Sequence, residues 1–128
     1  MGVFRRKRHE ELLDPNDRSP KTGLKYKDLS VLGGLVEAGA NLTEPRHVLH
    51  YLYFKSREAA DAAAVDGRDR GFDCTAREPL PDDPDQWCLV AERHGVVVDV
   101  MTVRDHGDFF DGLAERHAGE YDGWEASV

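Results

Sequence analysis

The sequence predicts an α+β domain with the element order β-α-β-β-α-β, preceded by one further helix. Segments rich in β-branched and aromatic residues at 47–54, 72–78 and 86–100 are typical of strands, and a fourth follows Gly119 near the C-terminus. Residues with helical spacing separate the first strand from the second and the third strand from the fourth. The two middle strands then pair as a hairpin. Both helices cover one face of a four-stranded antiparallel sheet, which is a ferredoxin-like sandwich.

The first expected elements are bounded by residues with known terminal preferences. The extra helix spans about 28–38, with Asp28 as its N-cap and Gly39 beyond its end. The first strand has apolar groups on both faces, which is typical of a central strand. Ser56 then caps an alanine-rich helix, and Gly71 ends that helix because glycine readily adopts the left-handed conformation.

The second half of the chain contains the hairpin and the second helix of the sandwich. Gly95 marks a bulge or a break in the third strand. Thr102, followed three residues later by Asp105, resembles a capping box, so the helix is expected to begin there. Phe110 and Leu113 belong to a stripe with helical spacing and should lie on its buried face.

The two cysteines lie in the strands of the expected hairpin. If the acidic, proline-rich turn at 79–85 is centred on Pro81, antiparallel pairing places Cys74 directly opposite Cys88. In a reducing compartment, two small half-buried thiols are a more common outcome than a disulfide. We therefore expect neighbouring free thiols, and whether they ever form a bridge stays open.

Charge is distributed unevenly along the 128 residues, a length that suits one domain. Residues 1–27 contain eight Lys and Arg against four acids, whereas residues 28–128 contain nine against twenty-one. We interpret residues 1–24 as a basic, disordered arm and residues 25–128 as the folded domain. An anionic domain repels nucleic acid, because RNA and DNA binding requires basic surface, so a protein partner is favoured.

Residue patterns for export, membrane insertion, catalysis and metal binding are missing from the sequence. No apolar run approaches the roughly 18 residues needed to span a bilayer and no export signal is visible, so a cytoplasmic location is expected. No serine occupies a Gly-x-Ser-x-Gly turn, and no glycine-rich phosphate loop is present. The six histidines are scattered, and His47 and His50 should face opposite sides of the sheet. We expect no enzyme activity, no cofactor and no metal.

Near its C-terminus the chain contains Tyr121-Asp122-Gly123-Trp124, which is its most specific motif. Together with the first strand ending at Phe54, the alanine-rich helix closed by Gly71-Phe72 and the acidic hairpin, this motif makes residues 28–128 resemble the RraB family. RraB proteins are acidic ferredoxin-like regulators that inhibit the endoribonuclease RNase E. The resemblance implies a non-catalytic protein that binds and modulates an RNase E-type endoribonuclease. The chain differs from the family in its basic arm and its less acidic hairpin, so the identity of the partner and the oligomeric state stay open.

The candidate protein-binding residues come from the acidic turn and the C-terminal motif. They are Asp82, Asp83, Asp85, Tyr121, Asp122 and Trp124. We expect the Trp124 ring to pack against Phe110 and Leu113, and the Tyr121 hydroxyl to lie at a rim.

Two other functions use the same fold. Ferredoxin-like domains also serve as small-molecule-sensing modules. RNA recognition on the open sheet is the other alternative, with Tyr51, Tyr53 or Trp87 as stacking platforms. The negative charge and the missing RNA-binding sequence pattern disfavour RNA recognition.

Overall fold

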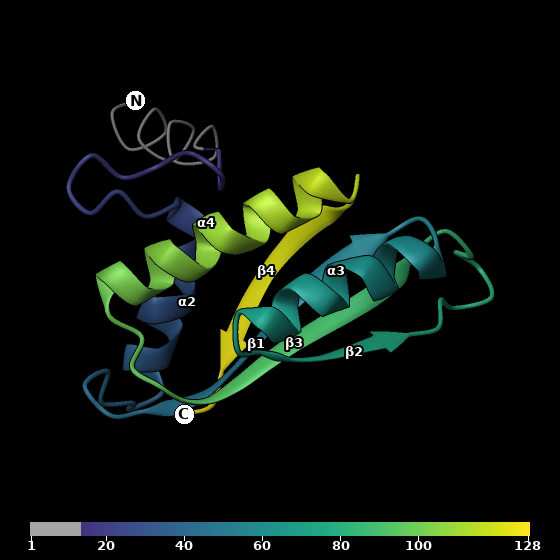
Figure 1. Cartoon of the computed structure of the whole chain (residues 1–128). Helices are drawn as coiled ribbons and strands as arrows, with labels where there is room; N and C mark the ends of the chain where they lie inside the picture. Colours follow the sequence, from purple (N-terminus) through teal and green to yellow (C-terminus); the bar gives the residue numbers. More distant parts are fainter. Residues whose placement is uncertain (1–13) are drawn as a thin grey trace.

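A computed structural model describes residues 14–128 and confirms the predicted ferredoxin-like α+β architecture. The four strands form one antiparallel sheet in the spatial order β2-β3-β1-β4. Strands β1 and β3 therefore lie in the centre, and β2 and β4 form the edges (Figure 1). The strands are β1 (Arg46–Phe54), β2 (Asp73–Arg77), β3 (Trp87–Val96) and β4 (Glu120–Ala126).

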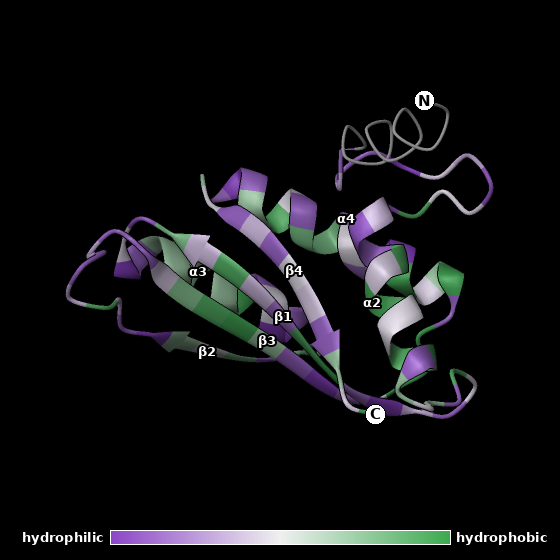
Figure 2. Ribbon diagram, turned by 180° about the vertical axis from the view of Figure 1, so that it is seen from behind, coloured by the Kyte–Doolittle hydropathy of each residue, from purple (hydrophilic) through white to green (hydrophobic). Residues whose placement is uncertain are grey.

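Two helices cover one face of the sheet and leave the other face open. Helices α3 (Arg57–Asp69) and α4 (Val100–Arg116) lie side by side across the strands in Figure 1. Figure 2 shows the opposite side, where the strands stand in front of both helices. The extra helix α2 (Tyr26–Glu37) packs beside the edge strand β4. No helix in residues 14–128 combines the length and apolar character that crossing a membrane requires.

Strand β1 shows why the sheet has one buried and one half-buried face. Its nine residues alternate strictly between buried and intermediate side chains, beginning with buried Arg46 and ending with buried Phe54. This period of two places Val48, His50 and Leu52 towards the helices. The alternate residues, among them Tyr53, lie on the open face.

The core consists of two clusters of buried side chains. The larger cluster joins the alanines of α3 to Phe110 and Leu113 of α4 across the sheet. The small alanine side chains allow α3 to approach the strands closely. The second cluster contains Leu35, Val103 and Trp124, so it joins α2 and the start of α4 to β4. The predicted packing of Trp124 against Phe110 and Leu113 is therefore wrong.

Side-chain caps fix the starts of both covering helices. The Ser56 side chain accepts a hydrogen bond from the Ala59 backbone N–H, as predicted. Helix α4 begins earlier than expected, because Asp99 is its N-cap and accepts from the Thr102 N–H at 2.8 Å. The predicted capping box that begins at Thr102 is wrong. Strand β3 ends at Val96, earlier than the predicted residue 100.

Helix α2 also begins earlier than predicted. Lys25 occupies the N-cap position without a side-chain cap, and Asp28 lies in the first turn with 5% of its surface exposed. Asp28 is not an N-cap. It accepts a hydrogen bond from the Trp124 side chain, so its burial serves the contact between α2 and β4.

Glycines occupy two positions where the backbone requires them. Gly71 follows α3 with φ +96°, as predicted, because other residues are strained in this conformation. Gly95 has φ +70° within the stretch of β3 where the register against β1 shifts, so the predicted bulge is confirmed. After α4 the left-handed residue is Ala118, with φ +55°. Gly119 has a different role, because its missing side chain lets the backbone pass close to the Phe54 ring.

The described part of the expected arm is attached to the domain. Leu24 is fully buried in the second core cluster, contrary to the expectation that residues 1–24 contribute nothing to a core. Arg18 forms an ion pair with Asp108 of α4 at 3.0 Å. The basic cluster at 5–8 lies outside the described residues.

Candidate functional site

The acidic turn between β2 and β3 is exposed and borders a hollow at the end of the sheet. Asp82, Asp83 and Asp85 are all exposed. Leu80, in the same turn, has 75% of its surface exposed. The hollow has a volume of about 460 Å³. Its lining includes Tyr53, Arg77, Leu80, Asp83, Gln86 and Cys88.

Asp122 lies on the same open face as this hollow. The register between β1 and β4 shifts at Tyr51 and Leu52, so Asp122 is an extra, exposed residue in β4. Burial raises the pKa of Tyr53, and its interactions with Cys88 and Asp122 raise this pKa further. Asp122 is thus close enough to Tyr53 to affect it electrostatically. Tyr53 thus lines one hollow together with Asp83 and is within range of the charge of Asp122.

The other two predicted contact residues point into the protein. Trp124 has 8% of its surface exposed, and its Nε1 donates to Asp28 Oδ1 at 3.0 Å. Tyr121 is half-buried, and its hydroxyl lies 2.7 Å from His50 Nδ1. The expectation that this hydroxyl lies at a rim is wrong. Both aromatic side chains therefore contribute to the interior of the domain.

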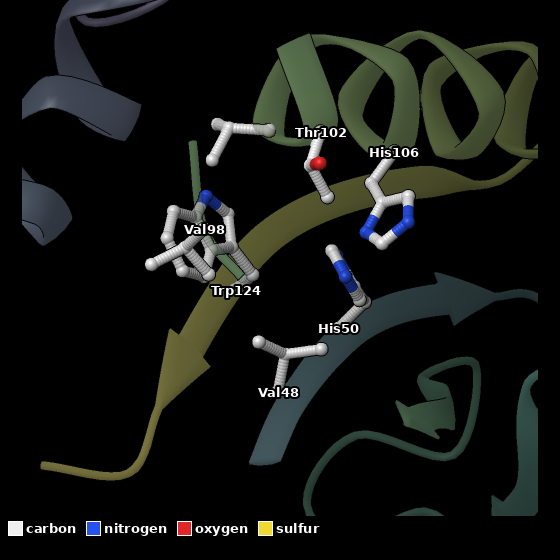
Figure 3. Close-up of a pocket in the computed structure, with 7 residues that line it drawn as sticks. Val48, His50, Val98, Thr102, His106 and Trp124 are labelled. Carbon is white, nitrogen blue, oxygen red and sulfur yellow. The ribbon is translucent and has the colours of Figure 1, made fainter. Parts of the chain in front are cut away.

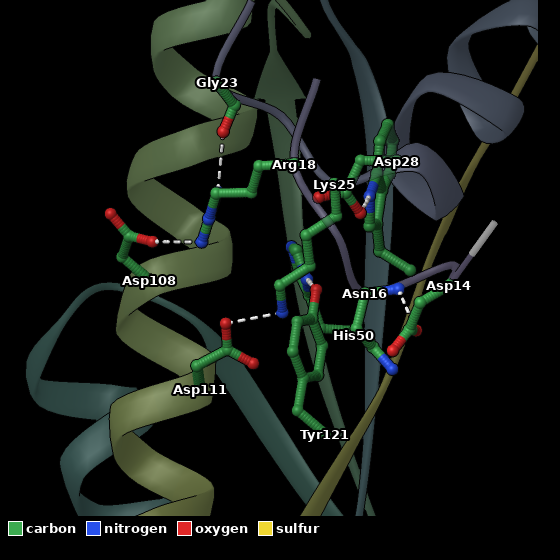
Figure 4. A network of polar contacts seen from close by, with 11 residues as sticks. Asp14, Asn16, Arg18, Gly23, Lys25, Asp28, His50, Asp108, Asp111 and Tyr121 are labelled. Carbon is green, nitrogen blue, oxygen red and sulfur yellow. Dashed lines mark hydrogen bonds and ion pairs between the residues drawn. The ribbon is translucent and has the colours of Figure 1, made fainter. Parts of the chain in front are cut away.

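A network of polar side chains joins α2, α4 and β4 around Tyr121 (Figure 4). Lys25 Nζ lies 2.6 Å from Asp111 Oδ2, although Lys25 is largely buried. The ammonium groups of Lys25 and Lys27 lie 5.9 and 5.5 Å from the centre of the Tyr121 ring. These contacts hold the helix that precedes the sandwich against the C-terminal strand.

The His50–Tyr121 pair is neutral near pH 7. Burial, with a smaller effect of His106, lowers the pKa of His50 to about 3. Burial also raises the pKa of Tyr121. Neither group changes its protonation state in the neutral pH range. The pair therefore has the properties of a structural contact rather than of an acid–base site.

A comparison against known protein families matches most of this fold. The family model described as RraB, regulator of ribonuclease activity B, matches residues 27–126. This chain belongs to the RraB family. A comparison with curated individual proteins gave no significant match. Members of the RraB family are regulators of ribonuclease activity, so a regulatory role follows from the match.

The matched range covers the whole RraB domain as the structure shows it. It begins in the first turn of α2, includes all four strands and ends at Ala126, the last residue of β4. Helix α2 therefore belongs to the RraB domain, and its buried Asp28 lies inside the matched range.

A small cavity inside the RraB domain lies beside His50 (Figure 3). It has a volume of about 10 Å³ and is bordered by Thr102, His106 and Trp124 among others. Within the described part of the chain His50 Nε2 has no hydrogen-bond partner. A cavity of this size is comparable to one water molecule, whereas small-molecule sites occupy roughly 300–1,000 Å³. This cavity is therefore too small to hold a small-molecule ligand.

The two cysteines lie on opposite faces of the sheet. Cys74 pairs with Ala91, and Cys88 pairs with Arg77, so the predicted direct pairing of the cysteines is wrong. Both thiols are free. Burial raises the pKa of Cys74 to about 11 and also raises that of Cys88. Neither thiol is activated as a nucleophile at neutral pH.

The two histidines of strand β1 face opposite sides of the sheet, as predicted. His50 is buried against the helices, whereas His47 is half-buried on the open face, so the two cannot coordinate one ion together. Sequence reasoning missed the neighbours of His47, which are Glu92 and His94 of β3. Their proximity depends on the register between β1 and β3, which no local sequence signal specifies.

Proposed function

We propose that this protein regulates an RNase E-type endoribonuclease by binding to it, without catalysing a reaction itself. The family match over residues 27–126 supports the regulatory role and is the observation on which the proposal mainly rests. The resemblance of its terminal Tyr121-Asp122-Gly123-Trp124 motif to RNase E inhibitors supports the choice of nuclease.

The surface that we assign to the partner is named here the acidic face. It consists of Asp82, Asp83, Asp85 and Asp122 around the hollow that Tyr53 lines. Such a group of carboxylates attracts a basic protein segment and steers its approach. Leu80 and Tyr53 add apolar and aromatic surface, which provides contact area in the bound complex.

Tyr121 and Trp124 have an indirect role in this proposal. Their side chains point inward, so they position β4 and thereby Asp122, rather than contacting the partner. Strand β4 forms one edge of the sheet, which places Asp122 at the border of the acidic face.

The folded domain is not expected to bind RNA itself. RNA carries the same sign of charge as residues 28–128, which have twenty-one acids against nine basic residues. A filter-binding assay at about 0.1 M salt tests this, using a variant with Arg5, Arg6, Lys7 and Arg8 replaced by Ser. Micromolar RNA binding by that variant would contradict this part of the proposal.

The binding proposal is tested by association kinetics with an RNase E-type protein. The variant is Asp82→Lys, Asp83→Lys and Asp85→Lys in one chain. A control of equal charge change replaces Glu37, Glu44 and Asp69 by Lys; these residues are exposed, and they lie at the end of α2, in the loop before β1 and at the end of α3. If the acidic face binds the partner, the first variant should slow association much more than the control. Equal rates for both variants would mean that only net charge acts, and the acidic face would not be the binding surface.

A further inference from the structure

Three potential metal ligands meet on the open face of the sheet, away from the acidic turn. They are His47 of β1 and Glu92 and His94 of β3. One ligand atom from each residue lies within 4.8 Å of the other two. Figure 2 shows this end of β3 as hydrophilic, near the C-terminus of the chain.

The bulge in β3 brings these side chains together. Leu49 pairs with Glu92, but the register shifts between Arg46 and Val48, so β3 contains one extra residue opposite His47. Gly95, with φ +70°, allows the backbone to bend there. His94 consequently stacks on His47, with ring centres 4.0 Å apart and planes within 3° of parallel.

Two of the three potential ligands already contact each other. His47 Nε2 lies 2.7 Å from Glu92 Oε2, which orients both groups. A tetrahedral Zn²⁺ with bonds of about 2.0–2.2 Å holds its ligand atoms about 3.3 Å apart. The His47 and His94 rings, which now stack in parallel, must turn apart so that one nitrogen of each points at the ion. The side chains of His47 and Glu92 are 29% and 36% exposed, so they have room to rotate.

The local charge favours a cation. A metal binds neutral imidazole and ionised carboxylate, and in that state the three ligands together carry one negative charge. Across the sheet, the row that contains Glu92 also contains Asp73 of β2 and Glu125 of β4. These carboxylates increase the negative potential on this face.

We propose that His47, Glu92 and His94 bind one divalent transition-metal ion, with Zn²⁺ as the best match. Imidazole nitrogen with carboxylate oxygen suits Zn²⁺, Co²⁺, Ni²⁺ and Cu²⁺, whereas Mg²⁺ and Ca²⁺ prefer all-oxygen sites. Three protein ligands leave a fourth position for water or for a side chain of another molecule. This site is independent of the proposed nuclease partner, because it uses none of the residues of the acidic face.

The test is metal binding by the full chain. Calorimetry with Zn²⁺ should give one site per chain, and Co²⁺ should give the intense visible absorption of a tetrahedral ion. Mg²⁺ should not compete. Metal binding should weaken at acid pH, because metals displace protons from their ligands.

Three variants assign the site. His94→Ala and Glu92→Gln should each weaken Zn²⁺ binding by at least about tenfold, since loss of even a supporting residue typically has an effect of 10- to 100-fold. Glu125→Gln is the matched control, because it removes a carboxylate from the same face outside the cluster and should weaken Zn²⁺ binding far less than either ligand variant. Thermal unfolding without metal checks that each variant folds. No binding at about 0.1 mM metal, or equal affinity in His94→Ala and the parent, would overturn the proposal.

Discussion

The indole Nε1 of Trp124 donates a hydrogen bond to Asp28 Oδ1 at 3.0 Å, although the two residues are 96 positions apart. The bond joins the C-terminal strand to the helix that precedes the sandwich. Burial raises the pKa of Asp28, while the Trp124 bond and the charges of Lys25 and Lys27 act in the opposite direction. The carboxylate is thus kept in the interior by a specific donor and by flanking lysines.

Two replacements of Trp124 should separate the contribution of its ring to the free energy of unfolding from the contribution of its N–H. Trp124→Ala removes a buried aromatic ring and should lower the free energy of unfolding by about 3–5 kcal/mol. Trp124→Phe keeps most of the apolar contact but leaves Asp28 without its donor, which should cost about 1–3 kcal/mol. Urea unfolding measures both. Trp124→Phe with unchanged stability would show that the indole N–H contributes nothing.

Asp28→Asn serves as the partner variant for this bond. The amide oxygen still accepts from Trp124, and the desolvation of a charge is removed. We therefore expect it to be much less destabilising than Trp124→Phe. A larger loss than that of Trp124→Phe would mean that the negative charge itself stabilises the fold.

The neutral state of His50 predicts a dependence of stability on pH. The pKa of His50 is about 3 in the folded chain and about 6.5 in an unfolded one. The unfolded state therefore takes up the proton first, and the contribution of His50 to stability is lost as the pH falls from about 6.5 towards 3. The slope is at most about 1.4 kcal/mol per pH unit for one proton. Asp28 has a raised pKa and acts in the opposite sense.

The resonance of the His50 ring tests this directly. Its NMR shift should stay constant between pH 8 and pH 5 in the folded protein, where Tyr121 and His106 surround the ring. The same residue in urea should titrate near its ordinary pKa and serves as the control. Titration of folded His50 near pH 6.5 would contradict its assignment as a buried neutral side chain.

Two glycines near the end of α4 should respond in opposite ways to alanine. A Cβ on Gly119 would lie 2.5 Å from the Tyr53 carbonyl oxygen and would also collide with the Phe54 ring, so Gly119→Ala should be strongly destabilising. A methyl group on Gly112 would have no neighbour within 4 Å, so Gly112→Ala should stabilise α4 by about 0.5–1 kcal/mol. Thermal unfolding of the two variants compares them, and similar melting temperatures would refute the packing described for Gly119.

The thiols should react slowly and separately. Cys74 is 7% exposed and its pKa is about 11, so it should react with a disulfide reagent at neutral pH only when the protein opens. Cys88 is more exposed and should react first. Because the two lie on opposite faces, mild oxidation should not join them within one folded chain. Mass spectrometry without reductant would contradict this if it found an internal bridge in folded protein.

The elements that sequence reasoning predicted correctly have local causes. The alternation of β1, the Ser56 cap and the left-handed Gly71 each depend on residues within one or two turns. The start of α4 was predicted wrongly. The sequence prediction considered only Thr102, whereas Asp99 caps the helix, three residues earlier.

The features that sequence reasoning missed depend on pairing between distant segments. The position of Cys74 opposite Ala91 follows from a hairpin turn whose centre lies beyond Pro81. The Trp124–Asp28 bond requires α2 to pack beside β4. The candidate metal site requires a bulge in β3 opposite His47. Each needs a register or a packing arrangement, and a one-residue change in register moves every side chain of a strand to the other face.

Cleavage of a structured RNA by an RNase E-type nuclease, with and without this protein, tests the proposed regulation most directly. We expect slower or redirected cleavage in the presence of the protein. The variant with Asp82, Asp83 and Asp85 replaced by Lys should largely lose the effect, and the control with Glu37, Glu44 and Asp69 replaced by Lys should retain it. Unchanged cleavage at protein concentrations on the order of tens of micromolar, together with no binding by calorimetry, would contradict the proposed regulation.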